Sequence, residues 1–380
     1  MPTAPPRKVL LSMKHIGRRA AAGLAALMLL GIGSAGALAA DDPDDSGTVV
    51  ILNKGDNNKI AGRDLIDGND HTTGTGHTVT RGTVPPTTPI TTAPRHVVAF
   101  YQTGTTTGDG TPYVSPAPLA GYADVVEVAA FHLNDPAQFP ILTLNDDAPS
   151  AAKYAPMWRD VAALQAKGVK VTALLGGAAP GTYTRLDADF AMYYPPIRDA
   201  LKTYKLDGID LDIEETFTEA TAERLINQLR TDFGPNFLIT LAPVPGDLTA
   251  AAGSRLPDVD YRTLEANVGS KINWYNAQFY CDNGSLADTS DYDAIIQNQF
   301  PASKVVAAAI TNSNLNCSGF VEMPTLQNTL RSLANRYPGF AGAAGWEYAP
   351  SRDVNATNCP TGPANWYCAV RQALPTATNP

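Results

Sequence analysis

The chain has 380 residues, of which 44% are hydrophobic and 17% charged, so it can bury a sizeable core and global disorder is excluded. Its formal net charge of −9 falls to −14 without residues 1–39, which carry five cations and no acid. A body this acidic repels phosphate, which argues against nucleic acids and anionic membranes as partners.

The N-terminal segment has the pattern of an export signal. Basic residues between Arg7 and Arg19 precede the apolar run AAAGLAALMLLGIGSAGALAA, which is too short and ends in too many small residues for a good membrane span. Ala37 and Ala39 offer a cleavage site, so we expect residues 1–39 to be a signal peptide and the mature protein to be secreted. A retained N-terminal anchor is the alternative.

The next two segments precede the main domain. Residues 40–82 are rich in acids, Gly, Asn and Thr around two short apolar pieces, and we assign them no role. Residues 83–94, TVPPTTPITTAP, are typical of an extended Pro/Thr-rich linker. The main domain is therefore predicted to cover residues 95–380.

From residue 95 onward, apolar runs of strand length alternate with helical patterns. Near-continuous apolar strands are typical of a parallel sheet that is buried on both faces. Helical spacing of apolar residues occurs at 158–168, 219–234 and 326–337. We predict an α/β fold, a (β/α)8 TIM barrel with a short N-terminal extension. The expected strands lie in HVVAFYQ, DVVEVAAFHL, KVTALLGGA, LDGIDLDIE, FLITLAPV, INWYNAQFY, KVVAAAI and FAGAAGWEY.

A doubly wound open sheet is the alternative fold. It is disfavoured because FYQTGTTTGDG, after the first strand, does not open a helix as a phosphate-binding loop would.

The four cysteines predict two disulfides if the protein is exported. Three pairings are possible, and we favour Cys281 with Cys317 and Cys359 with Cys368. Their spacing is unlike that of a zinc site.

The most informative segment is the acidic fourth strand. Asp210, Asp212 and Glu214 are spaced by two, so on a strand they share one face while Ile209 and Leu211 share the other. Carboxyls stacked this closely in a partly desolvated barrel raise at least one pKa and let neighbours share a proton. Glu214 comes last, at the end where barrel enzymes keep their chemistry, and suits a general acid.

Three other interpretations of this segment remain. A calcium loop of the EF-hand type would place its acids within a turn, but apolar residues alternate with these acids. A carboxylate metal site at the strand end is possible, although no His lies in the segment. A solvated acidic edge strand is the third.

At these residues the chain resembles glycoside hydrolase family 18. Its signature Asp-x-x-Asp-x-Asp-x-Glu is matched by Asp207, Asp210, Asp212 and Glu214. The likeness covers roughly residues 95–350 and is closest to the small single-barrel branch of endo-β-N-acetylglucosaminidases and compact chitinases. Other residues that stand where the family would have them are Gly176, Gly177, Asn276, Gln278, Tyr280 and Trp346.

The resemblance implies a retaining mechanism in which the 2-acetamido group of the sugar is the nucleophile and forms an oxazolinium ion. Glu214 would protonate the glycosidic oxygen, Asp212 would stabilise the acetamide, and Asp210 would share a proton with Asp212. Tyr280 would bond the acetamide oxygen and Trp346 would form the floor under the sugar. This family is an exception to the two-carboxylate scheme of glycosidases.

The remaining candidates carry structural alternatives. Asp207 could bind substrate or only hydrogen-bond backbone at the strand start, and Gln278 could touch sugar or orient Tyr280. His132 ends the second strand and could line the cleft, or could be structural.

The resemblance therefore predicts a secreted glycosidase that cleaves the β-1,4 bond of GlcNAc–GlcNAc in chitin or in the core of N-glycans. It implies no cofactor and no metal, and we expect a monomer that binds GlcNAc-containing carbohydrate. The alternative function is a catalytically inactive GlcNAc-binding lectin on the same barrel.

Overall fold

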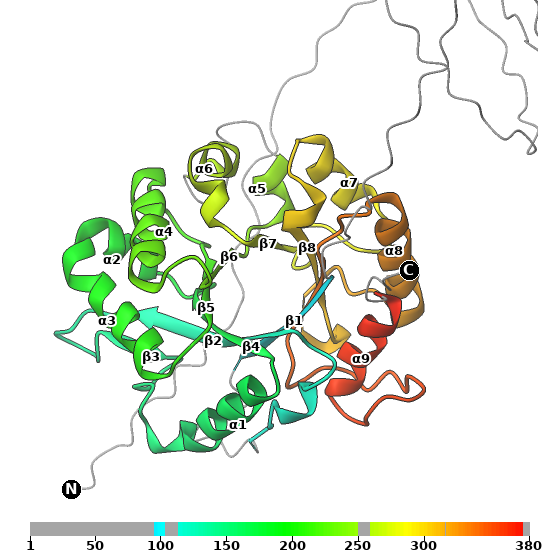
Figure 1. Cartoon of the computed structure of the whole chain (residues 1–380), viewed down its shortest axis with the longest axis horizontal. Coiled ribbons are helices and arrows are strands. Elements are labelled where there is room, and N and C mark those ends of the chain that lie inside the picture. The colour runs from blue at the N-terminus through cyan, green and yellow to red at the C-terminus, as the bar shows by residue number, and fades with distance from the viewer. Residues whose placement is uncertain (1–94, 103–112, 250–258, 316, 375–380) are drawn as a thin grey trace, which may run out of the picture. The chain divides into compact units, whose positions relative to one another are not determined.

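The computed structural model describes residues 95–102, 113–249, 259–315 and 317–374 (Figure 1). Eight parallel strands form one sheet in the order β1-β9-β8-β7-β6-β5-β4-β2, and β1 pairs in turn with β2, which closes the barrel. The predicted (β/α)8 barrel is therefore confirmed. The strands are β1 His96–Gln102, β2 Val125–Leu133, β4 Lys170–Gly176, β5 Gly208–Asp212, β6 Leu238–Leu241, β7 Trp274–Gln278, β8 Val305–Ile310 and β9 Gly342–Trp346.

Helices surround the barrel, as Figure 1 shows. They are α1 Ala155–Ala166, α2 Thr182–Ala188, α3 Phe190–Thr203, α4 Glu219–Phe233, α5 Pro245–Thr249, α6 Tyr261–Val268, α7 Ser290–Gln297, α8 Met323–Arg336 and α9 Ala364–Ala373. Short 3₁₀ helices cover Ala117–Leu119, Ala152–Tyr154, Gly269–Lys271, Ala302–Lys304 and Ser313–Leu315. Within the described part of the chain, no helix is long and apolar enough to cross a membrane.

Local sequence accounts for the ends of these helices. Thr218 caps α4 by accepting a hydrogen bond from the Thr221 N–H, and Gly234 follows the helix with φ of 79°. Between them Leu225, Ile226 and Leu229 are fully buried against the sheet. The helical spacing read from the sequence is thus realised as the face that packs on the barrel.

Each barrel strand divides its side chains between two environments. On β5, Ile209 and Leu211 pack into the layer between barrel and helices. The other face lines the barrel interior, where Phe100, Ala129 and Leu174 pack together with their counterparts on neighbouring strands. The acidic row of β5 lies on this inner face, because successive side chains alternate across a strand.

Two details differ from the sequence prediction. β5 ends at Asp212, so Glu214 lies two residues past the strand rather than within it. A ninth strand, β3 Leu142–Leu144, pairs antiparallel with the end of β2 and was not predicted, because three residues are too few for a periodic signal. The predicted signal peptide, the 40–82 segment and the linker lie outside the described residues.

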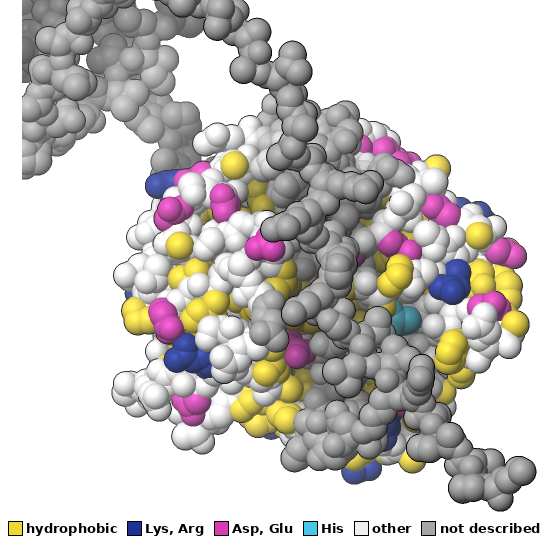
Figure 2. All heavy atoms as spheres, turned by 180° about the vertical axis from the view of Figure 1, so that it is seen from behind, with side chains coloured by type: hydrophobic (Ala, Val, Ile, Leu, Met, Phe, Trp, Pro, Cys, Tyr) yellow, Lys and Arg dark blue, Asp and Glu magenta, His cyan; other side chains and the backbone are white. Residues whose placement is uncertain are grey.

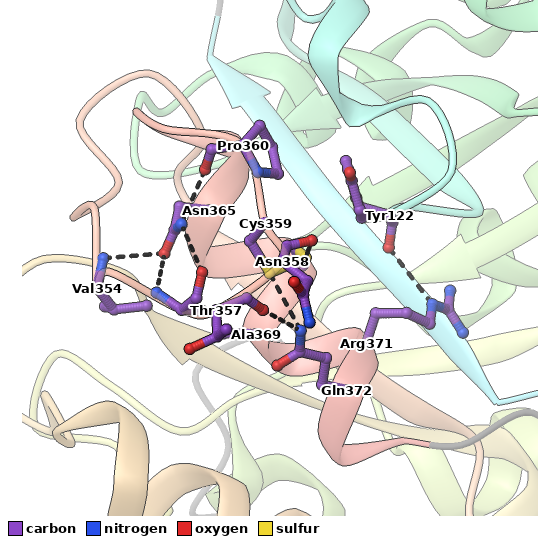
Figure 3. Close-up of a disulfide and its surroundings, with 12 residues drawn as sticks. Tyr122, Val354, Thr357, Asn358, Cys359, Pro360, Asn365, Ala369, Arg371 and Gln372 are labelled. Atoms are coloured by element: carbon purple, nitrogen blue, oxygen red, sulfur yellow. Dashed lines mark hydrogen bonds between the residues drawn. A yellow bond between two sulfur atoms is a disulfide. The ribbon is translucent and has the colours of Figure 1, made fainter.

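Both predicted disulfides are present, joining Cys281 to Cys317 and Cys359 to Cys368. The second ties a surface loop to α9 (Figure 3). The buried Asn365 side chain supports the same loop, because its Oδ1 accepts hydrogen bonds from the N–H groups of Val354 and Ala356. This region is therefore held by covalent and hydrogen bonds rather than by regular secondary structure.

Candidate active site

The carboxyls of β5 lie at two depths in the barrel. Asp210 is level with Leu174 of β4, and Asp212 is level with Gly176 at the C-terminal end of that strand. Asp210 is fully buried, Asp212 is 5% exposed, and Glu214 is half-buried just beyond the strand. The three acids therefore run from the barrel interior to its mouth.

Asn276 of β7 holds the deeper layer together. Its Nδ2 donates to Asp210 Oδ1 at 2.9 Å and to Glu127 Oε1 at 3.1 Å. The Thr240 hydroxyl donates to the same Asp210 oxygen, while Asp210 Oδ2 has no partner among the described residues. The carboxyls of β2 and β5, two strands separated by β4, thus share one amide donor from β7.

Gln278, two residues further along β7, holds the upper layer. Its Nε2 donates to Asp212 Oδ1 at 2.9 Å and to the carbonyl oxygen of Ala242 at 2.6 Å. The sequence left Gln278 either to contact sugar or to orient Tyr280. The structure instead places its amide on Asp212, so these hydrogen bonds make it an orienting residue for that carboxyl.

Burial raises the pKa of every carboxyl in this row. For Asp210 burial outweighs the hydrogen bonds from Thr240 and Asn276 and raises the pKa to about 7. The pKa of Asp212 lies well above its usual range, because burial is reinforced by the charges of Glu214 and Asp210. Burial also raises the pKa of Glu214, partly opposed by its polar contacts with Gln278 and Asp212. Burial therefore favours the protonated form of both carboxyls at the mouth, and for Asp212 the neighbouring charges add to this effect.

The glycine pair at the end of β4 makes room for Asp212. Gly176 and Gly177 have φ of 100° and 88°, and the Gly177 N–H donates to the Asp212 carbonyl oxygen at 2.9 Å. A Cβ on Gly176 would lie 2.3 Å from that oxygen, and one on Gly177 would lie 3.4 Å from Asp212 Oδ2. The absence of side chains at both glycines therefore lets the backbone and the carboxyl of Asp212 approach the end of β4.

Tyr280 and Trp346 complete the mouth. Tyr280 is 4% exposed, and burial followed by the charges of Asp212 and Glu214 raises its pKa, so its hydroxyl stays protonated and able to donate. Trp346 is half-buried at the end of β9 with its ring 5.5 Å from that of Phe100. Both side chains belong to the apolar lining of the barrel interior.

The disulfide of Cys281 adds a loop to this region. Cys281 follows Tyr280 directly, and its N–H donates to the carbonyl oxygen of Ser318. A Cβ on Gly319 would come within 2.9 Å of the Tyr280 Cα. The loop bonded through Cys317 therefore packs directly on the backbone of Tyr280.

Two sequence candidates lie away from this group. Asp207 sits at the start of β5, where its carboxylate accepts hydrogen bonds from the Val171 N–H at 2.9 Å and from Lys170 Nζ at 3.1 Å. This carboxylate is therefore engaged at the opposite end of the barrel from Glu214. The structural alternative given for Asp207 is the one that its contacts support.

His132 is half-buried at the end of β2. Burial lowers its pKa, and the carboxylates that oppose this effect are Asp146 and Glu215. Glu215 itself accepts hydrogen bonds from the N–H groups of Gly181 and Tyr183 at the start of α2. The histidine is thus associated with a loop-anchoring acid and not with the row on β5.

Glu127 is the site residue that the sequence analysis missed. It is fully buried on β2, and burial together with the charge of Asp210 holds its pKa well above the usual range. The available signal was a single acid inside the otherwise apolar run VVEVAAF, residues 125–131. Among the residues that the structure describes, no cluster of three or more His, Cys, Asp and Glu side chains could hold a metal ion.

Comparison with known proteins places this site in a family. No protein-family model matches the chain. The structure of a fungal endo-β-N-acetylglucosaminidase from glycosyl hydrolase family 18 is 35% identical, with a TM-score of 0.66, over 73% of this chain and 98% of the other. The chain belongs to glycoside hydrolase family 18.

Two fungal chitinases are also similar to the chain. Chitinase ChiC from Aspergillus fumigatus is 38% identical with a TM-score of 0.64, over 72% of this chain and 96% of that one. Chitinase 2 from Rhizopus oligosporus is 28% identical over an alignment of 254 positions that covers 60% of this chain. The chain spans only 44% of the length of that curated relative.

Proposed function

We propose that the protein is a retaining glycosidase that cleaves the β-1,4 bond between two GlcNAc residues with help from the substrate's own acetamido group. The observation that carries this proposal is the placement of Asp212 and Glu214 side by side at the mouth of the barrel, in an environment that raises the pKa of both. Such a pair offers a protonated acid beside a second carboxyl that can become charged.

In the first step Glu214 gives its proton to the glycosidic oxygen, and the bond from that oxygen to the anomeric carbon breaks. The 2-acetamido oxygen forms a new bond to the same carbon, which gives an oxazolinium ion. Asp212 develops negative charge against this cation, with Asp210 taking up the proton that the two share. Tyr280 donates a hydrogen bond to the acetamide oxygen, and Trp346 supports the ring.

In the second step Glu214 returns as a base. It takes a proton from water while the water oxygen attacks the anomeric carbon and the oxazoline ring opens. Two displacements at one carbon retain its configuration. The preorganised charges act where charge develops, so most of their effect falls on the transition state.

The bond can belong to chitin or to the core of N-glycans, and the relatives include a chitinase and an endo-β-N-acetylglucosaminidase. Of the aromatic side chains in the described residues, Phe139 is the one that is largely exposed, at 58%. A row of exposed aromatics for crystalline chitin is thus missing from this part of the chain. We therefore favour GlcNAc chains in solution, reached by a secreted enzyme that works as a monomer.

The surface charge agrees with a carbohydrate substrate. On the face shown in Figure 2, the visible Lys and Arg side chains are separated by acidic, apolar and uncharged ones, and the described atoms form no continuous basic patch. An uncharged polysaccharide needs no such patch, whereas phosphate would.

The test is product analysis on chitin oligomers beside a high-mannose glycoprotein, with wild type and Glu214→Gln. Loss of the general acid should reduce turnover by about 10²–10⁴-fold with substrate binding retained. Glu322→Gln is the matched control, since its side chain is 66% exposed and paired with Arg352, and it should behave as wild type. Equal absence of turnover in wild type and Glu214→Gln with intact binding would support the lectin instead.

A further inference from the structure

Glu127 is a buried acid for which the proposed mechanism has no step. It lies on the inner face of β2, level with Phe100 of β1 and Thr172 of β4, and is fully buried. Its Oε1 accepts one hydrogen bond, from Asn276, and its Oε2 has no partner among the described residues. An acid in this position is costly, so it calls for a reason.

The geometry of Asn276 links Glu127 to the row on β5. Trp274 Nε1 donates to Asn276 Oδ1 at 3.0 Å, which fixes the amide with its NH₂ group toward the two carboxyls. That group has two hydrogens, and the two acceptors are Asp210 and Glu127. If either acceptor is removed, a small shift of the side chain that keeps the Trp274 hydrogen bond can bring the amide closer to the other acceptor.

Burial, reinforced by nearby charge, raises the pKa of Glu127. The titratable groups that act on it are Asp210 and Asp212 of β5, and Tyr280, two residues past the end of β7, lies in the same field. Phe100 and Thr172 on the flanking strands do not titrate. Carboxyls in one dry space cannot all be ionised, and burial favours the neutral form of Glu127.

We propose that Glu127 is a positioning residue: a neutral carboxylic acid that shares the Asn276 amide with Asp210, and so keeps Asp210 able to exchange its proton with Asp212 during turnover. This role rests on the proposed function. Glu127 would touch neither the substrate nor the reacting atoms, and it acts only through Asn276.

Two variants separate this role from simple space filling. Glu127→Gln keeps an acceptor oxygen for Asn276 and is neutral, as the protonated acid is. Glu127→Met has similar length but no acceptor, so the Asn276 amide can shift toward Asp210, and a stronger hydrogen bond to a carboxylate lowers its pKa. Thr172→Val is the matched control, since Thr172 is buried at the same level and its hydroxyl has no partner among the described residues.

The measurements are kcat, KM and the pH profile of kcat on a chromogenic chitobioside. We expect Glu127→Gln and Thr172→Val to stay near wild type. Glu127→Met should lose about tenfold or more in kcat with little change in KM, and its alkaline limb should move down by about half a pH unit or more. A Glu127→Met enzyme with the wild-type profile, or a Glu127→Gln profile shifted equally, overturns the proposal.

A second readout does not require activity. The infrared difference spectrum of wild type minus Glu127→Gln near neutral pH should contain the carbonyl band of a protonated carboxylic acid. Its absence, with a carboxylate band in its place, also overturns the proposal. If wild type hydrolyses no GlcNAc substrate while this band is present, the proposed function fails and the neutral state of Glu127 stands.

Discussion

Replacing Asp210 by Asn should change how stability depends on pH. The side chain is fully buried, its Oδ1 accepts hydrogen bonds from Thr240 and Asn276, and its Oδ2 has no partner among the described residues. Asn at this position keeps the accepting oxygen and places its NH₂ where the unpaired oxygen lies. The substitution therefore mimics the protonated acid and removes only the ability to ionise.

The size of the effect follows from the pKa of Asp210, which burial raises from 3.8 to about 7. Between these values the unfolded chain has lost the proton and the folded protein retains it. The folded state is then the one that binds more protons, so wild-type stability falls as pH rises, by about 1.4 kcal/mol per pH unit for this group. Above pH 7 both states are ionised and the loss is complete.

Urea unfolding at pH 5 and pH 8 measures this directly. The stability of Asp210→Asn relative to wild type should be about 2–3 kcal/mol more favourable at pH 8 than at pH 5. Easier ionisation of the neighbouring carboxyls in the variant acts in the same direction. Glu322→Gln, an exposed control, should show little pH dependence. An equal difference at both pH values would mean that Asp210 is ionised throughout, and would refute this reasoning.

Three further predictions concern the mouth of the barrel. Asp212→Asn should lower kcat far more than it weakens ground-state binding, because the charge of Asp212 is needed as the oxazolinium forms. Single-turnover kinetics and inhibitor binding measure the two effects, and equal losses in kcat and in binding would contradict this prediction. Gly176→Ala should destabilise more than Gly168→Ala, since both have φ near 90° but only at Gly176 would the Cβ meet backbone, and urea unfolding compares them. Removing the Cys281–Cys317 disulfide should lower kcat, because the loop that it holds packs on Tyr280. Removing the Cys359–Cys368 disulfide should instead lower the free energy of unfolding by about 2–3 kcal/mol and leave kcat unchanged. Equal kcat in the two disulfide variants would contradict the last prediction.

Much of the fold could be read from local pattern. Side chains alternate with a period of two along any strand, so the spacing of Asp210 and Asp212 and of Ile209 and Leu211 determined which pair faces inward. Helical spacing likewise indicates which face of α4 is buried, and Thr218 and Gly234 are residue types that favour the two ends of a helix. Eight apolar runs separated by helices then left a closed barrel as the favoured arrangement.

Only the tertiary structure decided which of these residues meet. Strands in a barrel are tilted and staggered, so residues that face each other across the interior are far apart in sequence, as Glu127 and Asn276 are. The same stagger places Gln278 beside Asp212, whereas Asp207 is hydrogen-bonded to β4 at the N-terminal end of the barrel strands. Local spacing sets the face on which a side chain lies, whereas its partner and its charge state depend on the closed barrel that surrounds it.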